Sequence, residues 1–157
     1  MNPHVVSNSI NTICNPSIHE TLGKHVLVEL NGCPNHLLND ADYIEKVFST
    51  AVELAGAHVI TKVAHRFEPY GVSIVFVLSE SHLSIHTWPE RGYAAVDMYT
   101  CGTSDPATAC KYIVQELNAT SSYNTYVQRG LPCTPCTTSD LIKDPCITFY
   151  HEIRDRS

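Results

Sequence analysis

Residues 71–102 read GVSIVFVLSESHLSIHTWPERGYAAVDMYTCG, and this stretch decides the fold class. Val72 to Leu78 is a nearly continuous apolar run, which is typical of a central strand in a sheet. Residues 82–88 alternate between polar and apolar side chains, and residues 93–101 follow after the turn Pro89-Glu90-Arg91-Gly92. The stretch therefore predicts consecutive strands joined by short turns, which favours an antiparallel sheet.

The flanking segments supply helices and the remaining strands. Further strands are expected over residues 25–30, 57–67 and 121–129, and at about 145–152. Helices are expected at about 40–55 and 106–117, because apolar side chains recur there with the 3.6-residue period. This pattern predicts an α+β fold, a two-layer α/β sandwich with a mainly antiparallel sheet packed against helices. The other face of the sheet must also meet something, and a second subunit is a reasonable candidate.

The bulk composition describes an ordinary globular domain, with 43% hydrophobic and 17% charged residues among 157. The net charge is −6 and Lys and Arg are not clustered, so we expect no nucleic-acid partner and no anionic membrane surface. No apolar run approaches the roughly 20 residues of a membrane span. The N-terminus has neither the basic region nor the apolar core of a secretory signal, so a cytoplasmic location is expected.

One domain is expected to occupy residues 23–157, preceded by a flexible N-terminal extension at residues 1–22. The extension is polar, rich in Asn and Ser, and lacks periodicity. The chain has seven cysteines, and an odd number without an export signal argues against a disulfide framework. Cys133 and Cys136 form a lone Cys-x-x-Cys pair, which is a weak signal for a metal or redox site.

Polar side chains are concentrated where the apolar strand ends: Ser79, Glu80, Ser81, His82, Ser84 and His86. Such groups need partners if they are buried, although the solvated face of an edge strand would produce the same alternation. Zinc on His82 and His86 is rejected, because four residues of a strand span roughly 13 Å. A hydrolase nucleophile elbow is rejected too, because Ser81 lacks the flanking glycines.

An intramolecular reaction of Ser81 is the remaining possibility. Its hydroxyl would attack the carbonyl of Glu80 and convert the amide into an ester. β-Elimination would then cleave the chain and leave dehydroalanine, which hydrolyses to a pyruvoyl group. This route needs a strained peptide and a positioned base, for which His86 is a candidate. The residues alone make the route possible but do not favour it over the edge-strand interpretation.

Residues 80–90, which read ESHLSIHTWPE, closely resemble the processing-site signature of bacterial and archaeal S-adenosylmethionine decarboxylases. The similarity covers roughly residues 23–130. It includes Gly23-Lys24-His25, His65-Arg66-Phe67, Pro69 to Ser73 and Asp97 to Gly102. The tail from Leu131 departs from the family pattern, and residues 1–22 extend beyond its usual start.

The resemblance implies a self-cleaving proenzyme. The cut would fall between Glu80 and Ser81, giving a β chain of residues 1–80 and an α chain of residues 81–157. The α chain would begin with a covalently attached pyruvoyl group derived from Ser81. In the family pattern, His86 takes the proton that drives β-elimination, and Ser73 assists processing.

The implied reaction is the decarboxylation of S-adenosylmethionine, with no pyridoxal phosphate and no metal. The substrate amine would form a Schiff base with the pyruvoyl group of residue 81. Cys101 would return a proton after carbon dioxide leaves. The product is the aminopropyl donor for spermidine synthesis. Without the resemblance, a buried thiol at a strand end would be the better interpretation of Cys101.

Substrate binding and assembly also follow from the resemblance. Phe67 would stack on adenine or contact the sulfonium, with core packing as an equal alternative. Glu90 would accept hydrogen bonds from the ribose, or it is a solvated turn residue. The family's site forms between protomers, which implies a homodimer of αβ protomers.

Two alternatives stay open at this point. One is a pyruvoyl-dependent arginine or ornithine decarboxylase on the same scaffold, against which the retention of Phe67 and Glu90 argues. The other is an unprocessed, non-catalytic regulatory paralogue, which would have no need of Ser81, His86 and Cys101 together.

Overall fold

The computed structural model describes residues 22–130 in full and residues 150–155 as backbone. The predicted extension at residues 1–22, apart from Leu22, lies outside these ranges. The Cys133/Cys136 pair does so as well.

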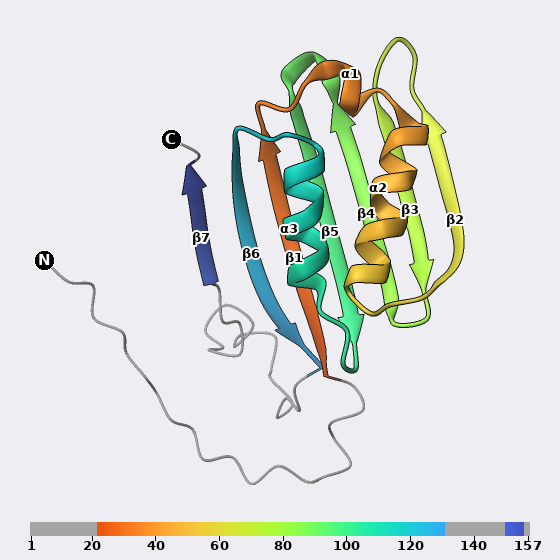
Figure 1. Cartoon of the computed structure of the whole chain (residues 1–157), viewed down its shortest axis with the longest axis vertical. Helices are drawn as coiled ribbons and strands as arrows, with labels where there is room; N and C mark the ends of the chain where they lie inside the picture. The colour runs from red at the N-terminus through yellow and green to blue at the C-terminus, as the bar shows by residue number, and fades with distance from the viewer. Residues whose placement is uncertain (1–21, 131–149, 156–157) are drawn as a thin grey trace, which may run out of the picture.

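The described strands form one seven-stranded sheet (Figure 1). They are β1 (Gly23–Asn31), β2 (Val59–Arg66), β3 (Val72–Leu78), β4 (Ser81–Trp88), β5 (Tyr93–Cys101), β6 (Ser121–Arg129) and β7 (Tyr150–Asp155). Their order is β2-β3-β4-β5-β1-β6-β7, and every neighbouring pair is antiparallel. Strands β2 to β5 follow one another as neighbours, whereas β1 is inserted between β5 and β6. The predicted antiparallel sheet is confirmed.

The strand ends differ slightly from the predictions. Strand β1 covers Gly23–Asn31 instead of residues 25–30, because its whole length pairs with β5 on one side and β6 on the other. A Cβ at Gly23 would lie 2.4 Å from the Tyr99 ring, so a larger residue there would need the Tyr99 side chain to move. Strand β2 begins at Val59 instead of residue 57, and β7 covers Tyr150–Asp155 where a strand was expected at about 145–152.

The two predicted helices are present as α2 (Ala41–Leu54) and α3 (Pro106–Glu116). Each begins after an aspartate whose carboxylate accepts a backbone N–H: Asp40 from Tyr43 at 3.0 Å, and Asp105 from Ala107 at 3.1 Å. The short helix α1 (Asn35–Leu38) and the 3₁₀ turn η2 (Pro89–Arg91) were not predicted as helical. Both are too short to show the apolar period on which the prediction depended.

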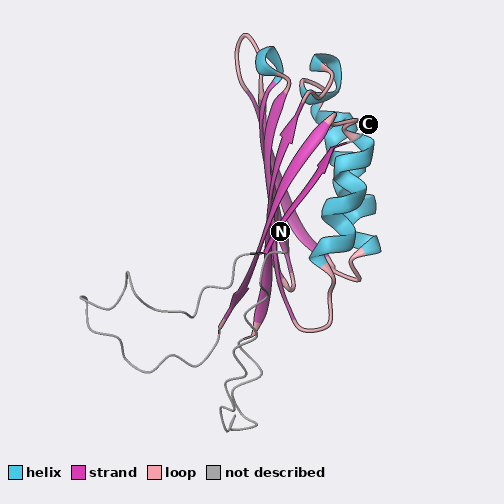
Figure 2. Ribbon diagram, turned by 90° about the vertical axis from the view of Figure 1, so that its left-hand side faces the viewer, coloured by secondary structure: helices cyan, strands magenta, loops and turns pink. Residues whose placement is uncertain are grey.

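Helices α2 and α3 lie on the same face of the sheet, which Figure 2 shows edge-on. The core fills the space between the two layers, where Phe48 of α2 meets Phe76 of β3 edge-to-face with ring centroids 5.6 Å apart. The two-layer α/β sandwich is therefore confirmed. No helix in residues 22–130 or 150–155 is long and apolar enough to cross a membrane.

The opposite face of the sheet, here called the open face, carries no described helix (Figure 2). Val63, Val75 and Val77 project from it on β2 and β3 and are 66%, 36% and 41% exposed. A cluster of apolar side chains open to water on a sheet face is typical of an interface. This face also carries predicted site residues on β3, β4 and β5, so they share a surface with the exposed valines.

Candidate active site

Ser81, the predicted cleavage residue, is the first residue of β4 and has a backbone φ of 149°. Apart from Ser81, only Asn118 among the described non-glycine residues has a positive φ. A positive φ costs a side-chain-bearing residue free energy, and such strain is concentrated at reactive positions. The chemistry inferred from the sequence required a strained peptide, and the strain lies at the residue that the chemistry names.

The peptide bond between Glu80 and Ser81 is held on its carbonyl side. The backbone N–H of Cys101 donates a hydrogen bond to the Glu80 carbonyl oxygen at 3.1 Å. The Glu80 carboxylate accepts from the backbone N–H of His58 at 2.9 Å and lies 3.0 Å from its ring Nδ1. Partial burial raises the pKa of Glu80, but the hydrogen bonds from His58 lower it by more than burial raises it. The pKa of Glu80 therefore lies below its ordinary value. Glu80 is therefore fixed as an anion beside the bond.

A second group of polar side chains surrounds Ser81 on the open face. His82 Nδ1 lies 3.2 Å from Ser81 Oγ, and His82 Nε2 lies 2.9 Å from Asp97 Oδ2. His25 Nε2 also lies 3.0 Å from Asp97 Oδ2, and Ser84 Oγ donates to the other carboxylate oxygen. Burial raises the pKa of Asp97, but the hydrogen bonds from His25, Ser84 and His82 outweigh it and hold the pKa well below its usual range.

The other predicted site residues lie together elsewhere. Ser73 Oγ is 2.7 Å from His86 Nδ1, across the β3–β4 pair. These two residues line a cavity of about 390 Å³ together with Phe67 and Glu90. Phe67 is 49% exposed and lies edge-to-face on His65, so the core-packing alternative for Phe67 is wrong.

The predicted site thus falls into two half-sites. The Ser81 half-site holds Glu80, Ser81 and Cys101, and the His86 half-site holds His86 together with Phe67, Ser73 and Glu90. Ser81 and His86 are five residues apart on β4, which corresponds to about 16 Å along an extended strand. The base that the sequence placed next to Ser81 is therefore out of its reach within one chain.

Two alternatives from the sequence are corrected by the fold. Residues 82–88 are not an edge strand, because β4 pairs with β3 on one side and with β5 on the other. Cys101 is not buried: it is the partly exposed thiol among the three described cysteines, whereas Cys33 and Cys110 are buried. Burial raises the pKa of Cys33 to about 11, so that thiol is inert at neutral pH.

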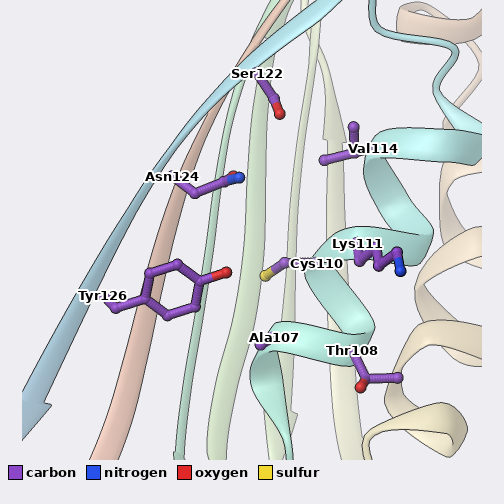
Figure 3. Close-up of a pocket in the computed structure, with 8 residues that line it drawn as sticks. All are labelled: Ala107, Thr108, Cys110, Lys111, Val114, Ser122, Asn124 and Tyr126. Atoms are coloured by element: carbon purple, nitrogen blue, oxygen red, sulfur yellow. The ribbon is translucent and has the colours of Figure 1, made fainter. Parts of the chain in front are cut away.

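A different cavity, of about 200 Å³, lies between α3 and β6 (Figure 3). Cys110 points into it from α3, and Asn124 and Tyr126 point into it from β6. Because α3 covers the helical face of the sheet, this cavity lies on the side opposite to His82 and His86. No residue of either half-site lines it, so it is not the candidate active site.

Sequence reasoning missed three polar side chains of the Ser81 region: His25, His58 and Asp97. His25 and Asp97 lie within the stretches that resemble the family, but nothing in the sequence pairs them with His82. His25, His82 and Asp97 offer ligand atoms within 4.8 Å of one another, a spacing that a metal ion can bridge. His82 is thus too far along β4 from His86 to share an ion with it, but it lies beside His25 and Asp97.

Comparison with known proteins connects both half-sites to one family. The model of the S-adenosylmethionine decarboxylase family matches residues 24–130, a range that contains both half-sites. The chain belongs to this family. The family resemblance inferred from the sequence is confirmed.

Relatives within the S-adenosylmethionine decarboxylase family match most of their own length. The S-adenosylmethionine decarboxylase proenzyme of Caldicellulosiruptor saccharolyticus is 49% identical over 121 residues, 76% of this chain and 98% of the relative. The proenzyme of Bacillus velezensis is 49% identical over 112 residues, 71% of this chain and 89% of the relative. The crystal structure of the adenosylmethionine decarboxylase from Aquifex aeolicus matches with a TM-score of 0.66 and 35% identity. That match covers 76% of this chain and 99% of the solved one.

Proposed function

We propose that this chain decarboxylates S-adenosylmethionine with a pyruvoyl group that it makes from its own Ser81. The observation that carries the proposal is the strained Ser81 whose preceding carbonyl is held by the Cys101 N–H. The relatives' name, proenzyme, indicates a protein that matures, and the strained peptide supports a cut between Glu80 and Ser81 in this chain. These names do not favour the arginine, ornithine or regulatory-subunit alternatives. A cytoplasmic location stays a prediction from the sequence.

The residues around position 81 fit a pyruvoyl group. Cleavage at Glu80–Ser81 would leave the group at the start of β4, opposite Thr100 of β5 and next to Cys101. When formed, the group supplies an electron-withdrawing carbonyl that accepts the electron pair left by the departing carbon dioxide. Cys101 has a partly exposed thiol at this end of β5, where it would return a proton to the substrate carbon.

The separation of the two half-sites supports a homodimer. A site that needs Ser81, Cys101, His86 and Ser73 together is incomplete when about 16 Å of strand separates its halves. Two copies related by a two-fold axis and packed open face to open face would place the His86 half-site of one against the Ser81 half-site of the other. The same packing would cover the exposed Val63, Val75 and Val77.

The His86 half-site would then act on its partner's Ser81. His86 is held by Ser73 Oγ at 2.7 Å and would take the Cα proton that drives β-elimination. Phe67 and Glu90 line the same cavity. The half-exposed ring of Phe67 would lie on the adenine or the sulfonium cation, and Glu90 would accept from the ribose hydroxyls.

Self-cleavage is the first testable outcome. The purified chain is expected to give two fragments that meet at Glu80–Ser81, with a blocked N-terminus on the second, because the pyruvoyl group has no amine. The measurement is intact mass under denaturing conditions, and Ser81→Ala is the control that stays at 17.4 kDa. A wild-type chain that stays uncut would remove the electrophile and the proposed activity with it.

The substrate class is tested at Phe67. Phe67→Ala is expected to raise KM for S-adenosylmethionine about 10-fold, because a stacked aromatic ring or a cation–π contact contributes about 1–2 kcal/mol. Phe67→Tyr keeps the ring and should change KM little. Steady-state release of labelled carbon dioxide measures both variants. Equal KM values for the three proteins would argue against an aromatic contact with the substrate.

A further inference from the structure

The hydrogen bonds around Ser81 form a chain that the roles above leave unused. Ser81 Oγ, the His82 ring and the Asp97 carboxylate follow one another at 3.2 Å and 2.9 Å. This is the order of nucleophile, base and orienting carboxylate in a Ser-His-Asp triad. We propose that His82 is the base that removes the Ser81 hydroxyl proton in the amide-to-ester step, while His86 acts only in the later elimination. The inference rests on the proposed self-cleavage.

The tautomer of a neutral His82 ring follows from its partners. A carboxylate can only accept hydrogen bonds, and the low pKa of Asp97 keeps it ionised. His82 Nε2 must therefore carry the proton that it shares with Asp97 at 2.9 Å. In a neutral imidazole the other nitrogen, Nδ1, then has a free lone pair, and it is this atom that lies 3.2 Å from Ser81 Oγ.

The orientation of His82 is fixed by three neighbouring strands. His82 lies on β4, Asp97 on β5 and His25 on β1, which are adjacent in the sheet. Asp97 is itself held by His25 at 3.0 Å and by Ser84, so it cannot turn away from His82 without losing both contacts. Asp97 and His25 are positioning residues, whereas His82 touches the reacting oxygen.

The proposed step balances within the chain. His82 Nδ1 takes the proton of Ser81 Oγ as that oxygen bonds to the carbonyl carbon of Glu80. The carbon–nitrogen bond then breaks, and the proton passes from His82 to the Ser81 nitrogen. The products are an ester between Glu80 and Ser81 and a free amine. Elimination at Cα is a separate proton transfer, for which His82 is not required.

The electrophile is prepared by the same half-site. The Cys101 N–H lies 3.1 Å from the Glu80 carbonyl oxygen, where negative charge develops when Ser81 attacks. The Ser81 half-site together with His82 thus supplies a nucleophile, a base and a donor to the developing oxyanion. These three parts suffice for an acyl shift, and the open His86 half-site contributes none of them.

A metal ion on His25, His82 and Asp97 is the competing interpretation. The two nitrogen–oxygen distances of 2.9 and 3.0 Å are ordinary hydrogen-bond lengths, so hydrogen bonds explain this geometry without an ion, and a chelator tests for one. Ser84 also donates to Asp97, which fits a carboxylate surrounded by donors. The hydrogen-bond network accounts for all four side chains.

Hydroxylamine distinguishes the two proton transfers, because it cleaves an ester rapidly and an ordinary amide slowly. His82→Gln keeps an amide that can donate to Asp97 but has no basic nitrogen at the Nδ1 position. We expect this full-length variant to mature at least about 10²-fold more slowly than wild type, and its uncut chain to resist hydroxylamine. His86→Ala is the matched control: its uncut chain should accumulate the ester and be cut by hydroxylamine between residues 80 and 81.

Further measurements separate the base from a structural role. Added imidazole should restore maturation of His82→Ala, because it supplies the missing lone pair. Asp97→Asn should slow maturation and leave a hydroxylamine-resistant chain. Thermal unfolding of each variant reports whether the fold is retained.

Several outcomes would overturn the inference. A His82→Gln chain that matures at the wild-type rate, or that accumulates a hydroxylamine-sensitive ester, would exclude His82 as the base. A His82→Ala chain that imidazole does not restore would do the same, and so would wild-type maturation that stops when a chelator is present. An uncut wild-type chain would instead contradict the proposed self-cleavage itself.

Discussion

Co-expression of Ser81→Ala and His86→Ala chains is expected to restore a cleavage that neither variant performs alone. In a mixed dimer, the intact Ser81 of the second chain would meet the intact His86 of the first, and one complete site would form. With random assortment of equal amounts, roughly half of the His86→Ala chains would be in mixed dimers and would be cut. Intact mass of the affinity-separated chains measures the fraction.

The control for this experiment uses the double variant Ser81→Ala/His86→Ala as the partner. It presents the same surface but no intact His86, so the His86→Ala chain should stay uncut beside it. Recovery with the double variant would show that the cut does not depend on the partner's His86. Absence of recovery with Ser81→Ala, in dimers shown by their tags to be mixed, would exclude a shared site.

Loss of the Cys101 thiol is expected to uncouple maturation from turnover. Cys101→Ala keeps the backbone N–H that holds the Glu80 carbonyl at 3.1 Å, so the chain should still be cut. The variant has no thiol to return a proton to the substrate carbon. We expect its decarboxylation rate to fall by about 10²–10⁴-fold, the usual contribution of a positioned acid. Intact mass measures the first effect, and release of labelled carbon dioxide measures the second.

Cys33→Ala is the matched control for removal of a thiol. Cys33 is buried and does not line the cavity of the His86 half-site, and burial raises its pKa to about 11, so it should not take part in proton transfer. Its loss should leave the decarboxylation rate of the matured protein unchanged. If Cys101→Ala matured and retained the rate of Cys33→Ala, the proton donor would have to be sought elsewhere.

The fold was predictable because its signals are local. The apolar run at residues 72–78 and the alternation at residues 82–88 each report the strand in which they lie. The aspartates at positions 40 and 105 mark the starts of both long helices. The short α1 was missed, because four residues do not display a helical period.

The candidate site was predictable only in part, because contacts between strands depend on register. Sequence resemblance named Ser81, His86 and Cys101. It did not indicate that His25 and Asp97, which are 72 residues apart, are in contact, or that the Asp97 carboxylate also contacts the His82 ring. That contact needs β1 to enter the sheet beside β5. Nor did the sequence reveal the φ of Ser81, which is a property of the folded hairpin.

Closeness in sequence was misleading at one point. Ser81 and His86 lie within six residues of each other, which suggested a nucleophile beside its base. On a strand the same spacing amounts to about 16 Å. Ser81 and His86 therefore lie in two separate half-sites and not side by side.

The place of β1 in the sheet bears on what happens after a cut at Glu80–Ser81. The first fragment would contain β1, β2 and β3, and the second would contain β4, β5, β6 and β7. In the sheet, however, β1 lies between β5 and β6 of the second fragment. The two pieces would be interlocked, joined along the β3–β4, β5–β1 and β1–β6 ladders. Because both fragments contribute strands to one sheet, we expect the uncut chain to fold before it is cut. After the cut, a protein that unfolds would have to find its other fragment by diffusion. The stability of the cut protein would therefore be kinetic, set by its unfolding rate. Complete unfolding would be hard to reverse in dilute solution.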